Sequence, residues 1–265
     1  MEHDQTAFFS ASRFSEGEAV SVKDRLAEEV PIALEYNGLS HAVMLATPGD
    51  LEDFALGFSL TEGIIADPAE WYGCEIWQLQ DGIRIAVEIA SERFHGLKER
   101  RRNLTGRTGC GICGAESLQH AVRQPGDVSG VTASFTSEAL HDGFAQMEAQ
   151  QQLRKQTGAT HAAAWMEESG KVTLLREDVG RHNALDKLIG AMAGNRIMPS
   201  GAALVTSRAS YEMVQKCTFA GIGILAAVSG PTALAVRMAE RSGLTLAGFV
   251  RRSGYTVYTR PERIR

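Results

Sequence analysis

Short apolar runs separated by turn-forming residues dominate the N-terminal third of the chain. Four of these runs form two pairs, and a glycine-containing turn typical of a β-hairpin separates the members of each pair. The pairs are Val30–Tyr36 with Leu39–Thr47, around Asn37-Gly38, and Glu75–Leu79 with Ile83–Ile89, around Asp81-Gly82. Between the pairs, apolar residues at helical spacing predict a helix that begins at Asp50 and extends towards Ile65.

The C-terminal half has a different pattern, in which segments of helical and strand periodicity alternate. A long helix is expected over Ser137–Gln156, and strands and shorter helices follow it. The expected strands are His161–Met166, Val172–Leu175, Ala202–Thr206, Ile222–Val228 and Leu244–Val250, and the expected helices are Asn183–Met192, Tyr211–Phe219 and Thr232–Arg241. Such alternation predicts a layered α/β domain with a largely parallel sheet, whose ligands bind where the strands end.

Residues 91–114 interrupt both patterns, because they are polar, basic and glycine-rich and have no clear period. We therefore expect an irregular segment and a subdomain boundary here. The predicted organisation is an N-terminal hairpin and helix subdomain over 1–108, a connection over 109–136, and an α/β domain over 137–265. The predicted fold class is a layered α/β/α domain with a smaller, β-rich α+β subdomain at its N-terminus.

The composition is that of an ordinary soluble globular protein, with 44% apolar and 22% charged residues among 265. No apolar stretch approaches the ~20 residues of a membrane span, no secretory leader is visible, and four cysteines are too few for a disulfide framework. We therefore expect a cytoplasmic protein without a membrane partner. A net charge of −5 excludes a uniformly basic nucleic-acid binder, although two basic segments, 91–107 and 249–265, predict a localised anion site.

The most specific motif is Gly109-Cys110-Gly111-Ile112-Cys113-Gly114. Two thiols at this spacing can share a metal, close a small disulfide ring or relay a sulfur atom, and the upstream arginines favour a thiolate. A zinc site would need further ligands. Zinc-dependent nucleotide deaminases combine such a pair with His-x-Glu, whereas two alanines follow His161 here, so zinc hydrolysis is excluded. We expect a reactive thiol loop and no metal.

Anion-binding residues follow several of the predicted strands. Asp178 and His182 lie in the segment Glu177–Lys187, where a strand passes into a helix whose first backbone N–H groups favour a phosphate or a pterin. Arg208 follows the next strand as a candidate phosphate clamp. The last of these loops combines an aromatic ring with paired arginines, which suits stacking on a flat ring and binding of phosphates, and consists of Phe249, Val250, Arg251, Arg252, Ser253 and Gly254.

This combination of motifs resembles the FdhD family of formate dehydrogenase accessory sulfurtransferases. The resemblance extends over most of the chain and is most specific in Arg107–Gly114, Glu177–Lys187, Thr206–Lys216 and Ser229–Arg251. It implies that a cysteine desulfurase loads Cys110 with a persulfide sulfur, with Cys113 assisting. It further implies that this sulfur goes to a molybdenum cofactor carrying two pterin guanine dinucleotides, which formate dehydrogenase needs. The larger domain would be similar to the cytidine deaminase fold, and Gly230 departs from the family pattern, where we expect a larger residue.

The favoured hypothesis is therefore a sulfurtransferase that binds the guanine dinucleotide across Arg208, His182 and Phe249–Gly254, with Asp178 as a candidate partner for the guanine edge. The cofactor is the bound acceptor rather than a permanent group, and a homodimer is expected as the commonest oligomer. One alternative is a non-catalytic cofactor chaperone for formate dehydrogenase. Another is a structural zinc module that uses Cys110 and Cys113 across a dimer interface.

Overall fold

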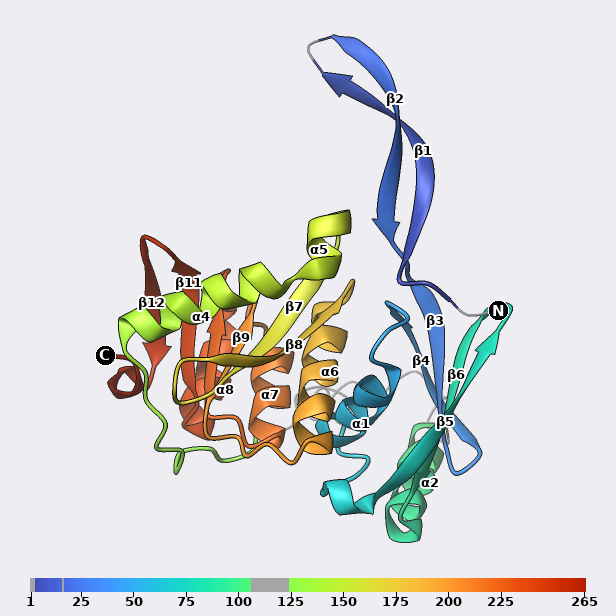
Figure 1. The fold of residues 1–265 in the computed structure, drawn as a ribbon. Helices are drawn as coiled ribbons and strands as arrows, with labels where there is room; N and C mark the ends of the chain where they lie inside the picture. Colours follow the sequence, from blue (N-terminus) through green and yellow to red (C-terminus); the bar gives the residue numbers. More distant parts are fainter. Residues whose placement is uncertain (1–2, 16, 106–123) are drawn as a thin grey trace.

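The computed structural model describes residues 3–15, 17–105 and 124–265, with the backbone alone for 100–105, and places three β-sheets along the chain (Figure 1). Cys110, Cys113 and Arg107 lie outside the described residues. None of the described helices is long and apolar enough to cross a lipid bilayer.

The largest sheet has six strands in the order β12-β11-β10-β9-β7-β8. Their bounds are β7 His161–Met166, β8 Val172–Asp178, β9 Ala202–Val205, β10 Ile224–Ala227, β11 Thr245–Arg251 and β12 Gly254–Thr259. Only β9, β10 and β11 are parallel to one another, while β7, β8 and β12 pair antiparallel with their neighbours. The prediction of a largely parallel sheet is thus wrong for the outer strands. The connections after β7 and β11 are too short for a crossover and close hairpins instead.

Helices cover both faces of this sheet, and the predicted layered α/β fold is confirmed. One apolar cluster lies between one face and α6 Arg181–Gly194, α7 Tyr211–Phe219 and α8 Ala233–Ser242. A second cluster lies between the other face and α4 Ser137–Gln150. The predicted helix over Ser137–Gln156 is interrupted at Gln151, after which the short α5 covers Gln152–Thr157.

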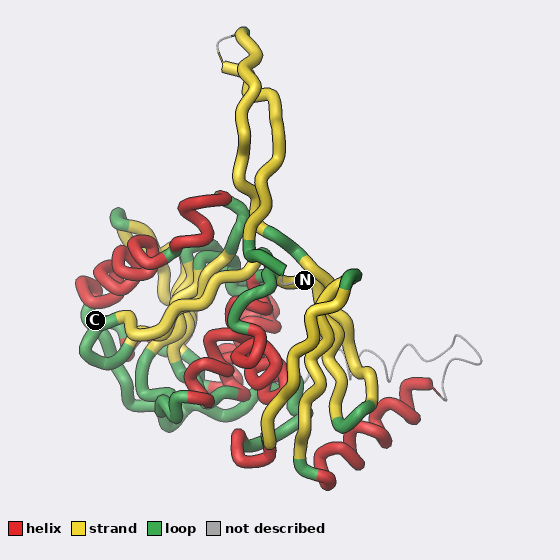
Figure 2. Tube along the Cα trace, turned by 45° about the vertical axis from the view of Figure 1, so that its right-hand side comes forward, coloured by secondary structure: helices red, strands yellow, loops and turns green. Residues whose placement is uncertain are grey.

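The N-terminal subdomain contains a four-stranded sheet in the order β4-β3-β6-β5 (Figure 2). Both predicted hairpins are present, and a parallel contact between β3 and β6 joins them. The elements are β3 Val30–Tyr36, β4 Leu39–Ala46, α1 Leu51–Thr61, η1 Pro68–Glu70, β5 Trp71–Leu79, β6 Gly82–Ile89 and α2 Ser91–Thr105, and the short helix η2 Pro261–Arg263 lies near the C-terminus.

Helix α2 contradicts the expectation of an irregular segment from residue 91. Its Glu, Lys and Arg residues have good helix propensity, although they leave no clear apolar stripe for a periodicity analysis to find. Leu97 is buried in the core of the subdomain, and Phe94 packs beside it. These two contacts are enough to hold the helix against the sheet.

The two subdomains are joined where α1 crosses α6. A Cβ atom added to Gly57 of α1 would overlap the backbone carbonyl of Asp186, and one added to Gly190 of α6 would overlap the carbonyl of Asp53. Glycine is therefore required at both positions for the helix backbones to approach this closely. The crossing is continuous with the cores on either side.

A buried ionic cluster reinforces this joint. Lys216 of α7 lies 2.9 Å from a carboxylate oxygen of Asp186, 3.0 Å from Oγ1 of Thr61 and 3.1 Å from Glu62. Burial lowers the pKa of Lys216, but the facing carboxylates of Asp186 and Glu62 outweigh that effect and raise it overall. The protonated Lys216 therefore joins α7 to Asp186 of α6 and to the C-terminal end of α1.

A long two-stranded ribbon, which we call the arm, extends from the body of the protein (Figures 1 and 2). It consists of β1 Thr6–Ser15 and β2 Glu18–Ala27, which pair antiparallel along their whole length. At its base, Nη1 of Arg25 donates a hydrogen bond to Oε1 of Gln156, which belongs to α5. The sequence analysis did not predict this element.

Candidate functional site

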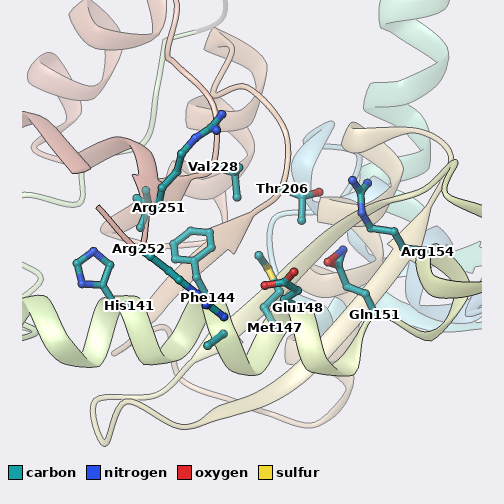
Figure 3. A pocket seen from close by; sticks show the side chains of 12 residues that line it. His141, Phe144, Met147, Glu148, Gln151, Arg154, Thr206, Val228, Arg251 and Arg252 are labelled. Carbon is teal, nitrogen blue, oxygen red and sulfur yellow. The ribbon is translucent and has the colours of Figure 1, made fainter. Parts of the chain in front are cut away.

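A cavity of about 370 Å³ opens where the three parallel strands end (Figure 3). Thr206 follows β9, Val228 follows β10, and Val250 and Arg251 end β11. Helix α4 forms the opposite wall. The lining residues are His141, Phe144, Ala145, Met147, Glu148, Gln151, Arg154, Thr206, Val228, Val250, Arg251 and Arg252. We call this the strand-end cavity, and its position agrees with the expectation that ligands of such a sheet bind at the carboxyl ends of its strands.

One end of the cavity is cationic. Arg251 and Arg252 lie there together with His141 (Figure 3). Nε2 of His141 is buried and has no hydrogen-bond partner among the described residues, while its ring contacts Tyr255 edge-on with 5.6 Å between ring centroids. Paired guanidinium groups beside an unpartnered imidazole nitrogen are suited to the oxygens of a phosphate.

The other end carries a carboxylate and an amide. Glu148 and Gln151 lie next to each other on this side, with Arg154 beyond them (Figure 3). Gln151 is 3% exposed, and its Nε2 donates to no atom of the described chain. A buried amide without a partner costs free energy, so this group is suited to a ligand that supplies an acceptor. The break between α4 and α5 at Gln151 directs the side chain to this position.

An aromatic and apolar wall connects the two ends. Phe144 lies between the arginines and Glu148, and Met147 and Val228 line the cavity beside it (Figure 3). Oγ1 of Thr206 accepts a hydrogen bond of 2.9 Å from the backbone N–H of Ala162, which fixes the floor of the cavity. The arrangement therefore suits a flat ring attached to a phosphorylated group.

Comparison with known proteins identifies the family. Residues 27–265 match the sequence profile of the FdhD/NarQ family. The chain belongs to the FdhD/NarQ family. Relatives named "Sulfur carrier protein FdhD" include one from Cupriavidus necator, 57% identical over 97% of this chain and 89% of its own, and one from Bordetella petrii, 56% identical over 93% and 89%. A crystal structure from Desulfotalea psychrophila, described as a formate dehydrogenase accessory protein, matches 99% of this chain and 100% of its own with a TM-score of 0.77 and 25% identity.

Within this FdhD/NarQ fold, the nine predicted cofactor-binding residues divide into two groups. Val250, Arg251 and Arg252 line the strand-end cavity. The others do not line it, and they are Asp178, His182, Arg208, Phe249, Ser253 and Gly254. Three of the predicted residues therefore lie at the strand-end cavity, while the remaining lining residues were not predicted.

Asp178 has a structural position instead of contact with a guanine edge. Its side chain is fully buried, and its carboxylate lies 2.7 Å from Nζ of Lys187, which is also fully buried. The same carboxylate accepts hydrogen bonds from the backbone N–H groups of Thr47 and Gly180 and from the amide of Asn183. It therefore joins β4 to the start of α6 and has no surface left for a ligand.

His182 lies in the first turn of α6 and Arg208 on the loop after β9, as predicted, but both are outside the cavity lining. Nε2 of His182 is 2.7 Å from a carboxylate oxygen of Glu212. Burial lowers the pKa of His182, and Glu212 opposes that effect only in part. Arg208 is exposed to solvent.

Phe249 explains the glycine at position 230. Its backbone has a φ of 55°, and its ring lies so close to Gly230 that a Cβ atom there would be 2.6 Å from Cζ. The larger residue that we expected at 230 would therefore displace the ring. Phe249 remains 50% exposed, on the outside of the cavity wall.

Neither of the two described cysteines of this FdhD/NarQ protein favours the thiolate. Burial raises the pKa of Cys217 to about 12 and that of Cys74 to about 11. Cys217 is a buried core residue, as predicted, whereas Cys74 is only partly buried beside the core of the N-terminal subdomain. The thiol chemistry expected of Cys110 and Cys113 stays a prediction.

The contribution of α4 to the cavity was not predicted. The apolar residues Leu140, Phe144, Met147 and Leu153 indicate the helix, but His141, Glu148 and Gln151 were assigned no function. The available signal was a polar stripe beside that apolar face. Only the fold shows that this stripe lies over the strand ends.

Proposed function

We propose that this protein is a cytoplasmic sulfur carrier that transfers sulfur from a cysteine desulfurase to a pterin cofactor needed by formate dehydrogenase. The cofactor, with molybdenum or tungsten and two guanine dinucleotides, is the acceptor. The name shared by relatives more than half identical to this chain supports the carrier role. The single observation that supports binding of the acceptor cofactor is the strand-end cavity, with cations at one end and hydrogen-bonding groups at the other.

Loading requires a thiol that gains a sulfane sulfur without net oxidation. The Cys110 thiolate attacks the outer sulfur of the desulfurase persulfide, a new S–S bond forms as the old one breaks, and the desulfurase cysteine leaves as a thiolate. The sulfur can then be released as sulfide in a balanced step. The Cys113 thiolate attacks the inner sulfur of the Cys110 persulfide, and hydrosulfide is the leaving group. A Cys110–Cys113 disulfide remains, and a cellular dithiol must reduce it before the next cycle.

The cavity supports recognition of a guanine nucleotide in a defined orientation. The phosphates would lie against Arg251, Arg252 and His141, and the base would stack on Phe144. Guanine presents N–H donors at N1 and N2 and an acceptor at O6. The carboxylate of Glu148 and the buried amide nitrogen of Gln151 are the complementary pair.

The decisive experiment is the intact mass of the full-length chain after incubation with a cysteine desulfurase and cysteine, with and without a thiol reductant. We expect a reductant-sensitive gain of one sulfur atom. Cys110→Ala should abolish the gain, while the matched control Cys74→Ala should retain it, because that thiol stays protonated. A Cys110→Ala chain that still activates formate dehydrogenase in cells would exclude the proposed carrier role.

A non-catalytic chaperone for the cofactor is the second candidate, because the strand-end cavity needs neither cysteine to bind a nucleotide. It predicts binding of GDP, measured by calorimetry, with no gain of sulfur on Cys110. In either case we propose a homodimer as the working assembly.

A further inference from the structure

The two faces of the arm differ in character. On one face, Phe8 is opposite Arg25 and Ser10 is opposite Lys23. Both cations lie over the Phe8 ring, Lys23 Nζ at 4.8 Å and Arg25 Cζ at 5.0 Å from its centroid. Arg25 also binds Gln156 of the body. This face therefore combines two cations with the exposed rings of Phe8 and Phe14, and at its base it is turned towards the protein.

The opposite face is largely apolar and exposed. It carries Ala7, Phe9 and Ala11 from β1 and Val20, Val22 and Leu26 from β2, together with Arg13, Asp24 and, at the tip, Glu18 opposite Ser15. Phe9 is 56% exposed, Val20 55% and Leu26 41%. A two-stranded ribbon has marginal stability in water unless a face is covered, so this face needs a partner surface.

The positions of the charged residues on this face indicate what kind of surface covers it. Along the ribbon, Phe9 is opposite Asp24, Ala11 is opposite Val22, and Arg13 is opposite Val20. The cross-strand pair that contains Asp24 and the pair that contains Arg13 thus lie at equal distances on either side of the central pair, Ala11 and Val22. When a second arm packs antiparallel on the first about this centre, the pair that contains Asp24 in each arm lies against the pair that contains Arg13 in the other. The Asp24 and Arg13 pairs thus complement themselves about a two-fold axis, which is typical of an isologous contact, while Glu18 at the tip would lie against Ala7 and Leu26.

We propose that the occupant of this face is the arm of a second copy of this chain, packed antiparallel and face to face. This inference deepens the homodimer proposed above and concerns only its interface. The arm lies almost wholly before residue 27, where the match to the family profile begins. The opposite face could not serve in the same way, because its central Lys23 would meet its own copy.

The test uses charge reversal in the full-length chain, followed by sedimentation velocity. Wild type should dimerise as its concentration rises. Arg13→Asp alone and Asp24→Arg alone should each weaken dimerisation at least about tenfold, because each creates like-charge contacts at both ends of the interface. An equimolar mixture of the two variants should restore the dimer, because in the mixed pair every contact again joins opposite charges.

The matched control is Lys23→Asp, an equally drastic charge change on the other face of β2, which should leave dimerisation unchanged. Circular dichroism of each variant verifies that the body remains folded. A wild-type chain that stays monomeric overturns the homodimer and the interface together. A dimer that both single variants leave intact overturns only the arm interface. Loss of the dimer in each variant without rescue in the mixture overturns the antiparallel register.

Discussion

Gln151 is the residue at which the chain interrupts a helix to place a buried amide at a cavity. The break costs backbone hydrogen bonds at the junction of α4 and α5, and the amide nitrogen remains without a partner among the described residues. In the proposed function, the guanine base compensates both local costs at Gln151. The neighbouring carboxylate of Glu148 would then select the base.

Substitution of Glu148 should change the selectivity of the cavity among bases. We expect Glu148→Gln to weaken GDP binding by about 10–100-fold, the effect of losing a hydrogen bond to a charged group. Binding of IDP, which lacks the N2 amine, should fall less, so the preference for GDP over IDP should shrink. Isothermal titration calorimetry measures both affinities.

The control for this experiment is Glu138→Gln, which makes the same change on α4 at a residue outside the cavity lining. It should leave both affinities unchanged. A loss of affinity in Glu148→Gln that is equal for GDP, IDP and ADP would mean that Glu148 does not contact the base.

At the scale of elements, the sequence predicted what periodicity and turns encode. His161–Met166, Tyr211–Phe219 and Val30–Tyr36 have the predicted bounds, because their apolar patterns end at clear turn or capping signals. Helix α2 and the arm were missed for opposite reasons. Helix α2 is too charged to have an apolar stripe, whereas the arm exposes its apolar face to solvent.

The crossing of α1 and α6 was also invisible in the sequence, and it yields a direct prediction. Gly190→Ala should lower the free energy of unfolding by at least about 2 kcal/mol, because the added methyl group overlaps the carbonyl of Asp53. Gly194→Ala, on the same helix with open space around it, should be neutral or stabilise by up to about 1 kcal/mol. Urea unfolding measures both. Equal effects of the two substitutions would show that the close crossing does not limit stability.

For the whole molecule, the sequence predicted the layered α/β architecture, and it pointed to the sheet edge at which the structure has the strand-end cavity. It could not predict that the outer strands are antiparallel, since this depends on connection lengths and pairings that periodicity does not encode. The sequence also could not show that Asp178 forms a buried ion pair with Lys187, because buried ion pairs and ligand sites contain the same residue types.

The glycine crossing and the Lys216 cluster predict that the two subdomains unfold together. Trp71 and Trp77 lie in the four-stranded sheet, and the fully buried Trp165 lies in the six-stranded sheet. A Trp165→Phe chain therefore reports on one subdomain by fluorescence, and a Trp71→Phe/Trp77→Phe chain reports on the other. Urea midpoints that coincide, after correction for the stability of each variant by circular dichroism, are expected. Separate midpoints would show that the joint is weaker than its contacts indicate.

The contact between Gly230 and Phe249 also has a consequence for evolution. Because the ring occupies the space of a side chain at 230, neither position is free to change alone. A lineage that acquires a larger residue at 230 must first lose or reorient the ring at 249, and the positive φ at 249 makes many replacements there costly. The two positions are therefore expected to covary among relatives, with small residues at 230 accompanying an aromatic ring at 249.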